Sequence, residues 1–84
     1  MNERVLILER LQAAAEDVLG QDAPRLTEDT ALSTETIDSL DLLEILMIIE
    51  DQEGTVIDGD AVTDVTDIRG VIDVIQSARA TVDD

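Results

Sequence analysis

Aliphatic residues recur at helical spacing in three stretches of the chain. The first stretch, from Val5 to Leu19, is followed by Gly20 as a stop signal, and its periodic positions are Val5, Leu8, Leu11, Ala15, Val18 and Leu19. A second run extends from about Ser39 to Glu53 and ends at Gly54. The third, of about a dozen residues, contains Ile68, Val71, Ile72, Ile75 and Ala78. The pattern predicts three amphipathic helices around one aliphatic core.

The segments between these helices differ in length. Residues 21–37 contain Pro24 and several Thr, Ser and Asp residues, so they predict an ordered loop that only Leu26, Leu32 and Ile37 hold to the core. Loops of this length are often functional. Residues 58–65 fit a short helical turn, and Val56-Ile57 has no second strand to pair with. We predict an all-α four-helix bundle with a long loop between helices one and two and a short third helix.

The second helix presents two different faces. At about 100° per residue, one sector is aliphatic and predicts the buried stripe Leu42, Ile45, Leu46 and Ile49. The opposite sector mixes apolar and acidic side chains: Leu40, Asp41, Glu44, Met47, Ile48 and Asp51. Such a face suits a partner that brings basic residues around an apolar pocket. Alternatively, Leu40 and Met47 pack against the long loop.

The charge of the chain narrows the classes of partner. Five arginines against 21 Asp and Glu give a net charge of -16 over 84 residues, which argues against nucleic acid and anionic membranes as partners. Partners that present Arg and Lys are expected instead. Acidity alone also fits a solvated surface or a disordered tail, but the 44% apolar content excludes wholesale disorder.

The residue inventory excludes most catalytic chemistry. Without Cys, His, Lys, Trp, Tyr or Phe, the chain cannot form a Cys-His or Ser-His pair or a zinc site, and we predict no metal site. Any reaction centred on it therefore uses a group supplied from outside. The lack of cysteine fits a reducing compartment, and no signal peptide or span of membrane length is found, so we expect a cytoplasmic protein. We also expect it to be a monomer.

Ser39 is the candidate for attachment of such a group. It lies between Asp38 and Leu40 at the predicted start of the second helix, where either Asp38 or Ser39 can cap the first-turn N–H groups. A phosphate on Ser39 would be stabilised by the same N–H groups and by the helix dipole. Capping is the structural alternative to modification.

With these flanks the chain resembles the acyl carrier proteins of the phosphopantetheine-binding family. The resemblance rests on Asp38-Ser39-Leu40-Asp41, on the acids and Met47 that follow, and on the closing Val65-Thr66-Asp67-Ile68 pattern. It covers nearly the whole chain, so residues 1–84 are expected to form a single freestanding carrier domain of acyl-carrier type. It implies a non-catalytic protein that partner enzymes use as a substrate.

The resemblance also implies roles for individual residues. Ser39 would receive 4'-phosphopantetheine from coenzyme A through a phosphopantetheinyl transferase, with Asp38 beside the phosphodiester, and the cargo would be carried as a thioester. Acyl-loading enzymes, ketosynthases and other acyl-processing enzymes with basic docking patches would read the partner-binding residues Leu40, Asp41, Glu44, Met47, Asp51 and Val65.

Two departures from the family pattern favour a specialised pathway over primary fatty-acid synthesis. Thr36 stands where carriers commonly have glycine, and Glu53 stands where fatty-acid carriers often have an aromatic residue. We therefore expect a carrier for polyketide or related biosynthesis. A peptidyl or aminoacyl carrier shares the same serine and stays open as an alternative.

Two interpretations that assign the chain to other classes of protein also stay open. One is an acidic protein-binding module without a prosthetic group, in which Ser39 is only a cap. The other is a calcium site at Asp58, Asp60 and Asp64. It fits poorly, because an EF-hand loop counted from Asp58 needs Gly and Glu where this chain has Thr63 and Arg69.

Overall fold

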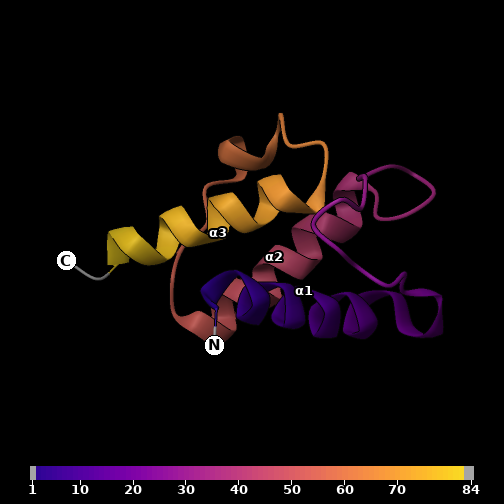
Figure 1. Cartoon of the computed structure of the whole chain (residues 1–84), viewed down its shortest axis with the longest axis horizontal. Helices are drawn as coiled ribbons and strands as arrows, with labels where there is room; N and C mark the ends of the chain where they lie inside the picture. Colours follow the sequence, from indigo (N-terminus) through magenta and orange to yellow (C-terminus); the bar gives the residue numbers. More distant parts are fainter. Residues whose placement is uncertain (1, 83–84) are drawn as a thin grey trace.

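The computed structural model describes residues 2–82, and for residues 80–82 it describes the backbone only. Three α-helices, α1 (Glu3–Leu19), α2 (Ser39–Glu53) and α3 (Ile68–Val82), are joined by segments that contain two short 3₁₀ helices, η1 (Gly20–Asp22) and η2 (Gly59–Val62). Helix α1 contacts both α2 and α3 (Figure 1). None of the helices in the described part has the length and hydropathy that a membrane span requires. The all-α prediction is confirmed.

The ends of α2 follow from local chemistry. Asp38 is the N-cap, and its Oδ1 accepts a hydrogen bond from the N–H of Asp41 at 2.9 Å. At the other end Gly54 adopts a left-handed conformation with φ 66°, and its N–H donates to the carbonyl of Glu50 at 2.9 Å. Glycine adopts this conformation without the strain that a Cβ introduces. The predicted bounds of α2 are confirmed.

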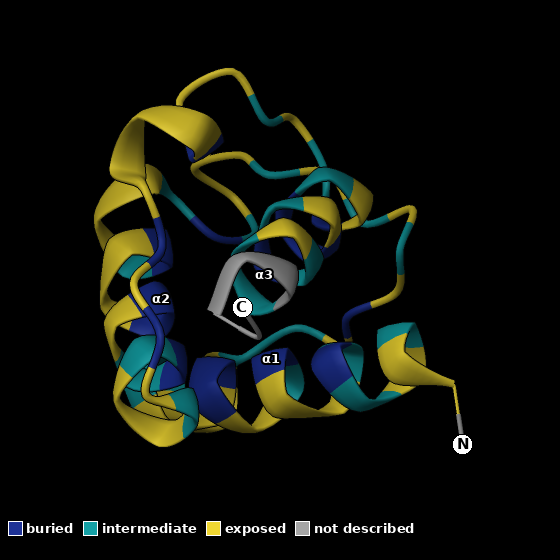
Figure 2. Cartoon of the chain, turned by 90° about the vertical axis from the view of Figure 1, so that its left-hand side faces the viewer, coloured by how far each residue is buried: buried dark blue, intermediate teal, exposed yellow. Residues whose placement is uncertain are grey.

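The core is aliphatic and lies where the three helices meet (Figure 2). The predicted stripe of α2 is confirmed, because Leu42, Ile45, Leu46 and Ile49 are all buried. In α3 the buried residues are Ile68, Val71, Ile72 and Ile75, also as predicted, and Ala78 packs against them.

The predicted face of α1 was partly wrong. Val5 is exposed, whereas Ile7 and Ala14 are buried together with Leu11 and Ala15. The reason is that residues 5–8 are all aliphatic, so their spacing alone does not fix which of them faces the core. The spacing of Ile7, Leu11, Ala14 and Ala15 still follows a helical stripe.

The segment between η1 and α2, residues 23–38, is an ordered loop held by the core and by backbone hydrogen bonds. Leu26 and Ile37 are buried, and Leu32 packs against the core from outside. The loop also pairs with the segment before α3: the N–H of Leu32 donates to Thr66 O at 2.9 Å, and the N–H of Ile68 donates to Thr30 O at 2.9 Å. The long loop is therefore a fixed part of the fold.

The short third helix is a 3₁₀ helix, η2, within the predicted region 58–65. Its N-cap is Asp58, whose Oδ1 accepts a hydrogen bond from the N–H of Asp60 at 2.9 Å. A single tight turn of this kind is common where a connecting segment is too short for an α-helix. Val56 and Ile57 form no strand, and Ala31 and Asp67 form an isolated antiparallel bridge.

Candidate functional site

Ser39 is the first residue of α2, and its side chain is exposed. Asp38 provides the cap, so the hydroxyl of Ser39 is not needed for that purpose. Within residues 2–82 this hydroxyl forms no hydrogen bond to another protein group. Of the two possible caps, the structure therefore uses the aspartate and not the serine.

The position of Ser39 suits a phosphate. The N–H groups of Ser39 and Leu40 belong to the first turn of α2 and have no intrahelical acceptor. The positive end of the helix dipole lies at the same place and favours an anion there. A phosphodiester on the Ser39 oxygen would meet both, which makes the residues present compatible with the attached group.

A pocket of about 620 Å³ opens beside Ser39. It lies between the loop, the first two turns of α2 and the η2 region, and Ser39 and Asp38 form part of its edge. Most of its wall is aliphatic and consists of Leu32, Ile37, Leu42, Leu43, Val62 and Val65. Its size is that of a small-molecule pocket, so an apolar group tethered to Ser39 has room to lie against it.

The outward face of α2 carries apolar and acidic side chains side by side. Leu40 is 72% exposed and Met47 is 65% exposed. The alternative that these two side chains pack against the loop is therefore wrong. Glu44 and Asp51 are exposed at helical spacing between and beyond them, and Asp41 is half-buried beside the cap.

None of these three acids has a cationic partner in the part of the chain that the structure describes. Among the ion pairs formed within residues 2–82, none includes Asp41, Glu44 or Asp51. Their charges are left for solvent or for another molecule. The predicted partner-binding residues of α2 thus lie along one face that starts at Ser39. Val65 lies apart from them, in the wall of the pocket.

Comparison with known families decides the class of protein. The family described as a phosphopantetheine attachment site matches residues 9–75 of the chain. The chain belongs to this family. Its members are carrier proteins with a covalently attached 4'-phosphopantetheine, they are generally non-catalytic, and they interact with phosphopantetheinyl transferases and acyl-processing enzymes. No curated protein and no solved structure gives a significant match.

The sequence left a calcium site at Asp58, Asp60 and Asp64 open as an alternative. In the described residues no group of three or more acidic side chains is arranged to hold a metal ion. Asp58 instead caps η2, which is a structural role for the first acid of the proposed calcium loop.

Sequence reasoning missed several residues around the site of this carrier protein. Leu43 is 46% exposed, so it adds a third exposed apolar side chain to Leu40 and Met47 on α2. The pocket was also not foreseen, because its wall combines segments that are distant in sequence. Glu53 was noted only as a departure from the family, yet its side chain is 7% exposed and lies 3.0 Å from Nε of Arg79.

Proposed function

We propose that the protein is an acyl carrier that holds its cargo as a thioester on a 4'-phosphopantetheine arm attached to Ser39. The observation that carries this proposal is the free, exposed hydroxyl of Ser39 at the start of a helix that Asp38 already caps. The arm supplies the thiol that this cysteine-free chain lacks. The chain itself supplies the attachment point, its electrostatic surroundings and the surface that enzymes read.

The attachment step requires Ser39 to act as the nucleophile. Its Oγ attacks the phosphorus of coenzyme A that bears the pantetheine. The bond from that phosphorus to the bridging oxygen breaks, and adenosine 3',5'-bisphosphate leaves. The hydroxyl proton would pass to a base supplied by the transferase. Asp38 would help to orient the new phosphodiester and the magnesium ion of the transferase.

The unpaired acids of α2 fit recognition by basic enzymes. Asp41, Glu44 and Asp51 would accelerate the encounter with a basic patch, while Leu40 and Met47 would provide apolar contact once the partner is bound. Ketosynthases and acyl-loading enzymes are the partners we propose for this face. The charge of -16 also favours a monomer, because two copies repel each other.

We assign the carrier to polyketide or other specialised biosynthesis. Glu53 supports this assignment, since its buried carboxylate occupies the position of the aromatic residue that is frequent in fatty-acid carriers. A peptidyl or aminoacyl carrier is the competing assignment. The two assignments are distinguished by incubating the protein that carries the phosphopantetheine arm, but no cargo, with acyl-loading and aminoacyl-loading enzymes. Only the matching enzyme will charge the thiol.

The central test is the intact mass after incubation with coenzyme A, magnesium and a broad-specificity phosphopantetheinyl transferase. The protein should gain one phosphopantetheine, and Ser39→Ala should gain none. Because Asp38 remains as the cap, Ser39→Ala should change the free energy of unfolding by less than about 0.5 kcal/mol. Ser77→Ala, which removes a serine hydroxyl on α3, is the matched control and should load normally. An unloaded parent with an active transferase would overturn the proposal.

A further inference from the structure

The loop before Ser39 contains two turns of the same construction. In the first, the N–H of Thr27 donates to Thr30 Oγ1 at 2.9 Å and the N–H of Asp29 donates to Thr27 Oγ1 at 3.3 Å. In the second, the N–H of Ser33 donates to Thr36 Oγ1 at 3.1 Å and the N–H of Glu35 donates to Ser33 Oγ at 3.2 Å. In each turn the two hydroxyl oxygens are also within hydrogen-bond distance of each other. The chain thus offers an internal comparison.

The two turns differ in the hydrogen bonds that the second threonine hydroxyl donates, since Thr36 Oγ1 also lies 3.5 Å from the carbonyl oxygen of Ser33, within its own turn. The hydroxyl of Thr36 donates to the carbonyl of Ala31 at 2.6 Å, which lies outside its own turn. A threonine hydroxyl has one donor and two acceptor positions. Thr36 can use all three, because its oxygen accepts from the N–H of Ser33 and can accept from the hydroxyl of Ser33. Within the described residues, Thr30 Oγ1 forms no hydrogen bond outside its turn.

The bond from Thr36 to Ala31 connects the entry of α2 with the rest of the fold. Ala31 forms the isolated bridge with Asp67, and the neighbouring Leu32 N–H is bonded to Thr66 O at 2.9 Å. Thr36 lies only three positions before Ser39. A continuous path of hydrogen bonds therefore runs from the segment before α3 to the residues that lead into Ser39.

The same turn forms part of the wall of the pocket beside Ser39. Ser33 and Thr34 line that pocket together with Ser39. On the other side of Thr36, Ile37 is anchored in the core with 2% exposure. Thr36 thus links the exposed Ser33–Thr34 part of the pocket wall to a helix entry that is anchored by the buried Ile37.

We propose that Thr36 is a positioning residue for the attachment of phosphopantetheine to Ser39. Its hydroxyl holds the Ser33–Thr36 turn against Ala31. This contact keeps the surface around Ser39, which the transferase binds, in a single conformation. The inference rests on the proposed function of Ser39. When the hydroxyl is lost, the segment populates other shapes, and only the fraction in the competent shape binds. The expected effect is on KM and not on kcat, since Thr36 does not touch the reacting atoms.

The test compares Thr36→Val, which keeps the shape of the side chain but removes the hydroxyl, with Thr30→Val in the other turn. The loading rate is measured at several concentrations of the carrier, with the melting temperature of each variant recorded. Loss of one or two net hydrogen bonds should raise KM for Thr36→Val by about fivefold to tenfold with kcat unchanged. Thr30→Val should melt lower than the parent by a similar amount but keep the parental KM. Thr36→Ser, which restores the hydroxyl, should return KM toward the parental value.

A parental KM for Thr36→Val, or an equal rise for Thr30→Val, would overturn the inference. If Thr36→Val does not fold, hydrogen exchange in the parent decides. The amide of Ser33 must then exchange more slowly than the equivalent amide of Thr27, and equal rates would refute a special role for Thr36. The proposed function is judged separately. It fails only if the parent itself is not loaded, whereas the inference fails if the parent loads and Thr36→Val loads with the same KM.

Discussion

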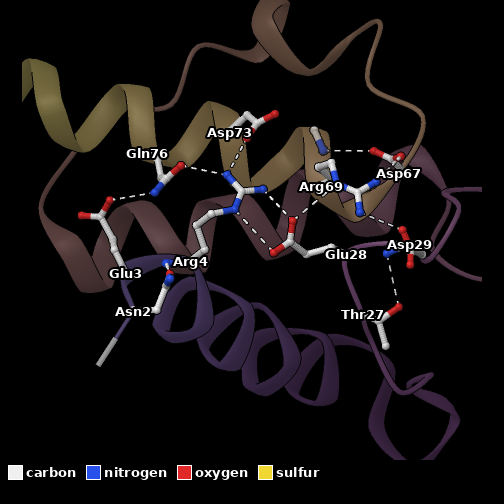
Figure 3. A network of polar contacts seen from close by, with 11 residues as sticks. Asn2, Glu3, Arg4, Thr27, Glu28, Asp29, Asp67, Arg69, Asp73 and Gln76 are labelled. Atoms are coloured by element: carbon white, nitrogen blue, oxygen red, sulfur yellow. Dashed lines mark hydrogen bonds and ion pairs between the residues drawn. The ribbon is translucent and has the colours of Figure 1, made fainter.

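The acids of this protein divide into two regions that differ in how their charge is balanced. Where α1, the loop and α3 meet, a paired region forms in which arginines form ion pairs with Glu28, Asp29 and Asp73 (Figure 3). Arg4 bonds Glu28 at 2.7 Å and Asp73 at 2.6 Å, and Arg69 bonds Asp29 at 2.8 Å. On the outward face of α2, Asp41, Glu44 and Asp51 have no such partner within residues 2–82.

The comparison of the two regions shows how the five arginines of the chain are distributed. Arg4 and Arg69 join segments that are far apart in sequence, so their ion pairs contribute to holding the loop against α1 and α3. Arg79 does the same for the inward-facing end of α2, where it meets Glu53. We infer that the four arginines that form ion pairs, Arg4, Arg10, Arg69 and Arg79, are used for the fold and that the charge next to Ser39 is left for partners. Three predictions test this division.

The largest effect is expected at Glu53, whose arginine-paired and buried carboxylate lies at the C-terminal end of α2. Glu53 is 7% exposed, with Arg79 Nε at 3.0 Å and Arg10 Nη1 at 3.9 Å. Arg79→Met leaves this carboxylate without its nearer cation, so unfolding should become easier by about 2–3 kcal/mol. For a domain of this size that corresponds to a fall in melting temperature on the order of 10–20 °C. Thermal unfolding measures it.

The controls for this variant separate charge from packing. Arg25 is exposed and forms no ion pair in the described residues, so Arg25→Met should leave the melting temperature nearly unchanged. The double variant Glu53→Leu with Arg79→Met removes both charges and should recover much of the loss. If Arg79→Met melts like the parent, the ion pair of Arg79 does not stabilise the fold, and the division fails on that side.

The second effect concerns the unpaired region. Glu44→Arg reverses a charge on the face beside Ser39, so association with a basic partner enzyme should slow by about tenfold at low salt, with a weaker dependence on ionic strength. Glu9→Arg makes the same change in net charge on the exposed side of α1, where Glu9 has no ion pair in the described part of the chain. It should slow association much less. Stopped-flow kinetics measures both, and equal slowing would mean that only total charge matters.

The contrast between the two regions also shows what the sequence could predict. The bounds and buried stripe of α2 were correct because Asp38, Gly54 and the aliphatic period are local signals. The predicted buried face of α1 was partly wrong, because the spacing within four consecutive aliphatic residues does not show which of them faces the core. The unpaired acids beside Ser39 were visible in one helix, since residues on one helix face can be placed by counting.

The paired region could not be predicted in the same way. Arg4 meets Asp73 across 69 positions and Glu28 across 24 positions, and no local pattern specifies such partners. The pocket beside Ser39 is equally non-local, since the loop, α2 and the η2 region all contribute to it. The Thr27–Thr30 and Ser33–Thr36 turns were not predicted either, although a local signal for them exists. Their Thr and Ser residues recur at the same three-residue spacing, a local signal that a search for side-chain-bonded turns would find.

The smallest effect is a pH dependence that belongs to the paired region. The hydrogen bond from Arg4 lowers the pKa of Glu28 below its ordinary value of 4.5, and Arg69 adds to this. The folded state therefore binds fewer protons at Glu28 than the unfolded state does. The stability from this pair is present above the ordinary pKa of glutamate and is lost as the pH falls through the lower pKa of the folded state.

Glu28→Gln should remove that contribution. Over the range from about pH 5.5 to pH 3, the stability of the parent should fall more steeply with acid than that of Glu28→Gln, as measured by urea unfolding at each pH. Glu9→Gln controls for the loss of one unpaired charge and should keep the parental slope. Parallel slopes for the parent and Glu28→Gln would show that the Arg4 pair does not stabilise the fold in solution, and that the two acidic regions differ in geometry but not in energy.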